Sequence, residues 1–187
     1  MKGMVMVVCG GSGSGKSEFA EQATTSFART DRDSKLLYIA TMMGEDAESK
    51  CKIQRHRHMR KDKGFETIEC FFDLKDLVLE NNSIVLLDCL SNLVSNECFA
   101  KGGAGKQTVE EVLAGIYSIK AQAKHLIIVT NDVFGDAISY DPYTQWFMQV
   151  LGQLNCHIAA LADEVVEVVY GIPVYYKGFL HGLKIGR

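Results

Sequence analysis

The 187-residue sequence lacks several features that would assign a protein to a class at once. It contains no long apolar run of the kind that spans a membrane. It has no excess of positive charge, and its net charge of −3 argues against a general nucleic-acid-binding protein. It also shows no internal repeat and no linker that would divide the chain. We therefore expect one globular domain over residues 1–187, without membrane insertion and without nucleic acid as a partner.

The cysteines also lack the spacing that is typical of metal-binding or redox-active pairs. The six cysteines include no C-x-x-C pair, so neither a zinc knuckle nor a redox pair is indicated. Reduced, mostly buried thiols in a cytoplasmic enzyme are the simpler interpretation. The apolar stretch from Met4 to Cys9 is too short for a signal-peptide core, and a glycine-rich loop follows it where a cleavage site would stand. We interpret this stretch as a first strand.

That glycine-rich loop is the most specific motif in the chain. It fits the P-loop pattern, G-x-x-x-x-G-K-[ST], and a helix-compatible stretch begins at Glu18. Glycines allow backbone N–H groups to turn toward phosphate oxygens, and the helix N-terminus favours negative charge. The lysine of the pattern reaches the β- and γ-phosphates, and the serine hydroxyl ligates Mg²⁺. The expected nucleotide-binding residues are Gly10, Gly11, Ser12, Gly13, Ser14, Gly15, Lys16 and Ser17, with Lys16 also catalytic and Ser17 also a metal ligand.

Short runs of Val, Ile and Leu alternate with helix-compatible stretches along the chain. This pattern predicts an α/β fold with a mainly parallel sheet that is covered on both faces. Ligands of such sheets bind at the carboxyl ends of the strands, where Gly10, Thr41, Asp88 and Asn131 all fall. Asp141-Pro142 has the pattern of an N-cap followed by proline at the first helical position. The expected strands are 4–9, 35–40, 65–70, 83–88, 125–130, 164–169 and 174–177, and the expected helices are 17–27, 46–60, 108–123 and 142–161, with one more after residue 88.

Acidic residues follow two of the apolar strands. Asp88 ends the strand 83–88, where P-loop proteins usually place an acid that holds Mg²⁺ or accepts a proton from a substrate hydroxyl. We take Asp88 as a catalytic and metal-binding residue, and the alternative is an ordinary cap of the next helix. Asp132 could be a second metal-shell or substrate contact, and a turn role is almost as well supported.

Residues 50–63 are dense in Lys and Arg and contain His56 and His58. On a helix, residues two apart point about 200° from each other, so these two cannot both face one site. From spacing alone, a solvated basic helix face is the favoured interpretation. The alternative is a nucleophilic or acid–base histidine among phosphate-binding cations, because a neutral imidazole can attack a nucleotide α-phosphate. We expect structural or solvent-facing roles for His125, His157 and His181.

These motifs together resemble the bifunctional adenosylcobinamide kinase / adenosylcobinamide-phosphate guanylyltransferase family of cobalamin biosynthesis. The resemblance extends over nearly the whole chain and depends on the order and spacing of the motifs. It implies a RecA-like P-loop sheet and a homotrimer. The matching motifs are Gly10–Ser17, Tyr38-Ile-Ala-Thr41, Lys52-Ile-Gln-Arg-His56 with Arg60, Thr67-Ile-Glu69, the run Leu86–Asn96, Val129-Thr-Asn-Asp-Val133, Gly152-Gln-Leu-Asn155 and Ala162-Asp-Glu-Val165.

The resemblance implies two reactions on a corrinoid substrate, with GTP and ATP as nucleotide substrates and Mg²⁺ as cofactor. One transfers the γ-phosphoryl group of ATP or GTP to the aminopropanol hydroxyl of adenosylcobinamide. The other transfers GMP from GTP to that phosphate through a guanylylated histidine, which gives adenosylcobinamide-GDP. His56 matches the family's nucleotidylated histidine best, because it lies in an Ile-x-x-His frame with Arg60 four residues later, and His58 is the reserve candidate. Thr41 and Arg60 complete the expected nucleotide-binding residues.

The chain departs from the family pattern in the segment between Asn131 and Gly152. The lost cations could have helped to bind phosphate or to hold a subunit contact. The alternative function is therefore a divergent P-loop small-molecule kinase, or a non-catalytic nucleotide-binding paralogue without the guanylyltransferase step. The departures are Asp132 for Glu, Ile138-Ser139 for Val-Pro, and Gln145, Met148 and Gln149 for an Arg followed by an Arg-Asp pair.

Overall fold

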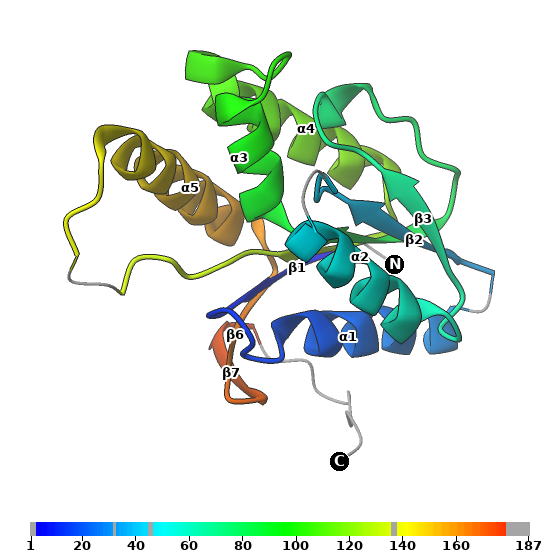
Figure 1. Ribbon diagram of the computed structural model, residues 1–187. Coiled ribbons are helices and arrows are strands. Elements are labelled where there is room, and N and C mark those ends of the chain that lie inside the picture. The colour runs from blue at the N-terminus through cyan, green and yellow to red at the C-terminus, as the bar shows by residue number, and fades with distance from the viewer. Residues whose placement is uncertain (1–2, 32, 45–46, 136–137, 179–187) are drawn as a thin grey trace.

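Strands and helices alternate along the chain in the computed structural model, which describes residues 3–31, 33–44, 47–135 and 138–178 (Figure 1). The strands are β1 (Met4–Cys9), β2 (Lys35–Ala40), β3 (Phe65–Glu69), β4 (Ser83–Asp88), β5 (His125–Val129), β6 (Glu164–Val169) and β7 (Ile172–Lys177). The helices are α1 (Lys16–Thr30), α2 (Ala47–Arg60), α3 (Leu90–Phe99), α4 (Thr108–Gln122) and α5 (Pro142–Leu161), with short 3-10 turns η1 (Leu74–Asp76) and η2 (Gly105–Gln107).

The seven strands form one sheet in the order β3-β2-β4-β5-β1-β6-β7. All neighbouring pairs are parallel except β6 and β7, which form an antiparallel hairpin. The predicted mainly parallel α/β sheet is therefore confirmed. β5 lies between β1, which leads into the P-loop, and β4, which ends at Asp88. In register, Asp88 lies beside Ala40 of β2 and Val129 of β5, so these strand ends share one edge of the sheet.

Helices cover both faces of this sheet (Figure 1). Successive strand residues point to opposite faces, so β1 contributes to two separate cores. Val5 and Val7 pack into the core beneath α3, α4 and α5. Met6 and Val8 pack on the other face with Phe19 and other residues of α1. Burial on both faces explains why the central strands read as continuous apolar runs.

The predicted local signal at the start of α5 is confirmed. The Asp141 carboxylate accepts hydrogen bonds from the backbone N–H groups of Tyr143 and Thr144, and Pro142 occupies the first helical turn of α5. A further hydrogen bond from the Thr144 hydroxyl is the main reason why the pKa of Asp141 is lowered. The first turn of α4 carries Glu110 and Glu111, whose negative charge suits a helix N-terminus, and Glu111 also pairs with Lys75 of η1.

The prediction of mostly buried thiols is wrong. All six cysteines lie in the described residues and are free, but only Cys89 and Cys98 are buried, whereas Cys51 and Cys156 are exposed. Cys51 lies on α2 and Cys156 lies on α5, each on a solvent-exposed face of its helix. His125 is buried as a structural residue, and His157 is exposed. His181 and residue 46 of the expected second helix lie outside the described residues. Within the described part of the chain, no helix combines the length and apolar character needed to cross a bilayer.

Candidate active site

The glycine-rich run forms a tight loop between β1 and α1. Gly10 has a φ of +150°, and a Cβ there would lie 2.6 Å from the Val168 carbonyl oxygen. Gly13 has a φ of +72° in open surroundings. The loop is closed by a hydrogen bond from the Ser14 amide to the Gly11 carbonyl, 3.2 Å long. A glycine-rich loop with such positive φ values can turn its backbone N–H groups toward a phosphate, as the P-loop pattern predicts.

Lys16 lies folded over this loop at the start of α1. Its Nζ donates to the Gly11 carbonyl oxygen at 2.9 Å. Burial lowers the pKa of Lys16, and the carboxylate of Asp88 opposes this shift. Because the ammonium group is partly desolvated, a phosphate that reached the loop would meet a weakly hydrated cation at short range.

A cavity of about 530 Å³ opens beside the P-loop at the carboxyl edge of the sheet. Its walls come from the P-loop with the start of α1, strands β2 and β3 with the segment after β2, helix α2, the end of β4 with the start of α3, and the segment after β5. The P-loop residues that face it run from Ser12 to Glu18. The remaining lining residues are Tyr38, Ala40, Met42, Ile53, Arg55, His56, Arg57, Arg60, Thr67, Glu69, Asp88, Cys89, Asn92 and Asn131.

Helix α2 presents His56 to this cavity and keeps His58 outside it. The His56 side chain is 20% exposed, and its Nδ1 lies 3.7 Å from Oδ2 of Asp88. That separation is within ion-pair distance but longer than a hydrogen bond. His58 is exposed and does not line the cavity. The structure therefore separates the two histidines as the helical spacing required, and it places the preferred candidate beside the P-loop.

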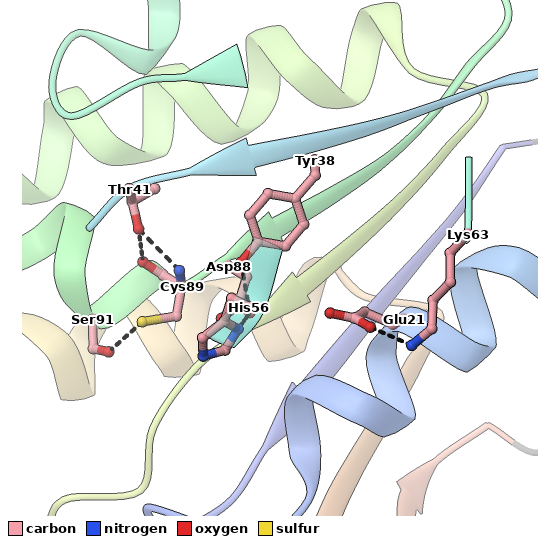
Figure 2. A network of polar contacts seen from close by, with 8 residues as sticks. All are labelled: Glu21, Tyr38, Thr41, His56, Lys63, Asp88, Cys89 and Ser91. Carbon is pink, nitrogen blue, oxygen red and sulfur yellow. Dashed lines mark hydrogen bonds and ion pairs between the residues drawn. The ribbon is translucent and has the colours of Figure 1, made fainter. Parts of the chain in front are cut away.

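Asp88 is the centre of a small polar network, which Figure 2 shows from close by. The Tyr38 hydroxyl donates to Asp88 Oδ2 at 2.9 Å. Burial, followed by the charge of Asp88, raises the pKa of Tyr38, so the phenol is a proton donor at neutral pH. On the face of the same ring, the Arg60 guanidinium lies 3.4 Å from the ring centroid. Arg60 is only 6% exposed, and its Nε and Nη1 have no hydrogen-bond partner.

Thr41, an expected nucleotide-binding residue, lies outside the cavity lining. It is fully buried, and its hydroxyl donates to the Cys89 carbonyl at 2.8 Å and accepts from the Cys89 amide at 2.9 Å (Figure 2). These bonds hold the backbone that directly follows Asp88. Nearby, the Ser91 hydroxyl contacts the Cys89 thiol at 3.1 Å and accepts a hydrogen bond from the side-chain amide of Asn131 at 2.6 Å. The turn after β4 is thus fixed by side chains from two neighbouring strand ends.

Two ion pairs hold α2 over the cavity. Lys63, three residues past the end of α2, has its Nζ 2.5 Å from a carboxylate oxygen of Glu21 in α1 (Figure 2). Arg57 donates to Glu69 at the end of β3 at 2.8 Å. Glu21 is fully buried, so the first pair is shielded from water on its acidic side. Together they tie the helix that carries His56 to both α1 and the sheet.

Asp132 and the residues that depart from the family pattern lie elsewhere. Asp132 is exposed and its carboxylate accepts from the Phe134 amide at 3.1 Å, which supports the turn interpretation. Gln145 is exposed on α5 and donates to the Tyr140 carbonyl. Neither these two nor Met148 and Gln149 line the cavity. The positions at which the family has these cations therefore lie outside the cavity wall, and their replacement changes none of its lining residues.

Sequence reasoning missed several residues of the site. Tyr38 gave no signal beyond its place in a strand motif, and its hydrogen bond to Asp88 joins residues 50 positions apart. The Glu21–Lys63 pair spans 42 positions and has no local pattern. Asn92 lines the cavity from the first turn of α3, two residues after the start of that helix. Only the three-dimensional fold brings these groups together.

Comparisons with known proteins show the family of this chain. The model of the family described as cobinamide kinase / cobinamide phosphate guanyltransferase matches residues 6–176. This chain belongs to that family. The bifunctional adenosylcobalamin biosynthesis protein CobU of Escherichia coli strain K12 is 32% identical over 188 residues, which cover 93% of this chain and 100% of the relative. The protein of the same name from Salmonella typhimurium strain LT2 is 31% identical, with the same coverage.

The family and the names of these relatives indicate an enzyme of cobalamin biosynthesis with cobinamide kinase and guanylyltransferase activity. The resemblance seen in the sequence is thus confirmed. Among solved structures, the flagellar accessory protein FlaH of Methanocaldococcus jannaschii matches with a TM-score of 0.54 and 14% identity, over 94% of this chain and 79% of that one. At that identity the likeness concerns the fold alone, and it supports the P-loop architecture.

Proposed function

We propose that this chain phosphorylates adenosylcobinamide with ATP or GTP and then transfers GMP from GTP to the product through guanylylated His56. The observation that carries the proposal is the position of His56, which shares one cavity with the P-loop and lies 3.7 Å from Asp88. A basic helix face that served only solubility would have no reason to turn a histidine into the cavity and leave it only 20% exposed.

In the kinase step, the P-loop amides and Lys16 hold the nucleotide phosphates. The corrinoid's aminopropanol hydroxyl attacks the γ-phosphorus, and the bond from that phosphorus to the β-phosphate oxygen breaks. Asp88 lies at the strand end that faces the loop and accepts the hydroxyl proton. Lys16 stabilises the charge that develops on the transferred group, because its partly buried ammonium lies against the loop.

In the guanylyl-transfer step, His56 is the nucleophile. Its Nδ1 faces Asp88, so its Nε2 carries the free electron pair that attacks the α-phosphorus of GTP. A phosphorus–nitrogen bond forms while the bond to the β-phosphate oxygen breaks, and pyrophosphate leaves. Arg60 lines the cavity, and its positive charge neutralises phosphate charge. A phosphate oxygen of the cobinamide phosphate then attacks the same phosphorus and releases His56.

Ser17 and Asp88 fit a magnesium ion in the chemistry of their donors. Both line the cavity, and hydroxyl and carboxylate oxygens are ligands that Mg²⁺ prefers. Mg²⁺ usually keeps several waters beside one or two protein ligands, so two oxygen donors from the chain are enough to hold it. When bound, the ion neutralises charge on the phosphates.

The decisive experiment is covalent labelling with GTP that carries the label at its α-phosphate. Purified protein is incubated with Mg²⁺ and the labelled GTP and then denatured, and the protein-bound label is counted. His56→Ala should abolish an acid-labile, base-stable label. His58→Ala is the matched control, because it removes a histidine from the same helix outside the cavity, and it should retain the label.

The other outcomes separate the alternative functions. Label that disappears only in His58→Ala would keep the covalent step and reassign the nucleophile. An unlabelled wild-type protein that still phosphorylates cobinamide would point to a kinase without a guanylyltransferase step. An unlabelled protein that binds GTP and turns over neither substrate would indicate a non-catalytic nucleotide-binding paralogue.

We also propose that the enzyme works as a homotrimer in the cytoplasm, with residues 1–187 acting as one domain. The family resemblance supports the trimer, and so do apolar side chains that are exposed around the start of α5, including Ile138 and Tyr143 at 67% and 74%. Six free cysteines support a reducing compartment. Light scattering after size-exclusion chromatography should give three times the mass of the 20.7 kDa chain.

A further inference from the structure

Tyr38 contacts two groups of the site through two different parts of its side chain. Its hydroxyl donates to Asp88 Oδ2 at 2.9 Å, and its ring face carries the Arg60 guanidinium at 3.4 Å. Tyr38 itself is 4% exposed and lies on β2, so its ring is held by the sheet. It lines the cavity, yet neither step described above needs it to touch a substrate.

We infer that Tyr38 is a positioning residue that fixes Asp88 through its hydroxyl and Arg60 through its ring. The inference rests on the proposed function, because Asp88 and Arg60 act in the two transfer steps. It assigns the two ends of one side chain to two separate tasks, which can be tested separately.

The hydroxyl end controls which way the Asp88 carboxylate faces. The same oxygen, Oδ2, lies 2.9 Å from the Tyr38 hydroxyl and 3.7 Å from His56 Nδ1. A carboxylate oxygen accepts more than one hydrogen bond, so the phenol can hold Oδ2 while leaving it open to His56. Because that oxygen is fixed, the Nδ1–H group of His56 is oriented toward it. The imidazole ring then directs Nε2 toward the cavity.

The ring end supports a cation with two unpaired nitrogen atoms. Arg60 is 6% exposed, and Nε and Nη1 have no hydrogen-bond partner. The tyrosine ring is the group on which this buried guanidinium stacks, and an arginine over an aromatic face is attracted most strongly when it is desolvated. Stacking fixes the plane of the guanidinium at the cavity wall, and arginine binds phosphate oxygens in that plane.

Two variants separate these tasks. Tyr38→Phe keeps the ring and removes the hydroxyl, so we expect His56 labelling in a single turnover to slow about tenfold while the Kd for GTP stays within about twofold. Tyr38→Leu removes both, so labelling should slow at least as much and the Kd for GTP should rise about tenfold. Tyr176→Phe is the matched control, because it removes another tyrosine–carboxylate hydrogen bond, to Glu167, away from the cavity.

A double-mutant cycle shows whether Tyr38 acts through Asp88. Labelling is followed over hours so that slow variants are still quantified. The tenfold effect of Tyr38→Phe should shrink to less than about twofold in an Asp88→Asn background. An unchanged tenfold effect in that background would overturn the role of the hydroxyl.

The remaining outcomes are also informative. If Tyr38→Phe is labelled at the wild-type rate, the positioning role is refuted. If the substitution lowers only the melting temperature and the fraction of active sites, Tyr38 has a packing role instead. Equal GTP affinity in Tyr38→Leu and Tyr38→Phe would refute the support of Arg60. A wild-type protein without label would overturn the covalent step and the hydroxyl role with it, and the GTP-binding comparison would still decide the Arg60 role.

Discussion

The ion pair between Glu21 and Lys63 should contribute more to stability than any other lysine–glutamate pair of the described structure. Glu21 is fully buried in α1, and its Oε2 lies 2.5 Å from Lys63 Nζ, whose side chain is 31% exposed. The second oxygen, Oε1, has no hydrogen-bond partner. Lys63→Met would therefore leave a buried carboxylate without its cation.

The size of the loss follows from this burial. Breaking a fully buried pair by removing one partner costs about 3–5 kcal/mol. Because Lys63 is partly exposed, water screens some of the interaction, and we expect a loss of about 2–3 kcal/mol in the free energy of unfolding. In a chain of this length that corresponds to a fall of about 5–10 °C in Tm.

Urea denaturation followed by circular dichroism, with reductant to protect the free cysteines, measures this loss directly. The double variant Glu21→Leu/Lys63→Met should recover at least half of it, since an apolar pair leaves no buried charge. Lys35→Met is the matched control, because its partner Glu80 and Lys35 itself are more than half exposed, and it should cost less than about 1 kcal/mol. A Lys63→Met variant within 0.5 kcal/mol of the wild type, on the order of a surface pair, would refute the reasoning.

Three further predictions concern the P-loop and pH. Lys16→Ala should lower the kcat of phosphoryl transfer about 10²–10³-fold at saturating nucleotide, measured by product formation. Gly10→Ala, whose Cβ would lie 2.6 Å from the Val168 carbonyl oxygen, should lower Tm clearly more than Gly13→Ala, where positive φ alone costs about 1–2 kcal/mol. Burial lowers the pKa of His125 below its usual value of about 6.5, so the unfolded state binds the proton more readily. The free energy of unfolding should therefore be highest above pH 6.5 and fall as the pH drops below about 6.5. When urea midpoints are measured against pH, those of His125→Phe should fall less steeply below about pH 6.5 than those of the wild type.

Much of the fold was predictable because its signals are local. The central strands β1, β4 and β5 are short apolar runs buried on both faces, and polar or glycine residues end or follow them in the chain. The start of α5 was predictable from Asp141-Pro142, because capping involves only the next few residues. The burial of the cysteines was predicted wrongly, since a residue type gives only an average tendency and not the face of a helix.

The site was predictable only in part. The P-loop, Asp88 and the pair of candidate histidines could be named from motif and spacing, and the helical period showed that one histidine must face away. Which of them faces the P-loop depends on how α2 is rotated over the sheet. That rotation depends on packing and on pairs such as Glu21–Lys63, which join distant segments.

The sequence by itself determined the P-loop, the alternation of strands and helices, and the set of groups able to do phosphate chemistry, because each of these depends on neighbouring residues. The tertiary structure alone decided that His56 lies beside Asp88, that Tyr38 joins Asp88 to Arg60, and that Thr41 holds the backbone after β4 and does not line the cavity. These contacts link residues that lie 22 to 50 positions apart. Such partners are selected by the order of strands in the sheet and by the packing of α2, which no local pattern encodes.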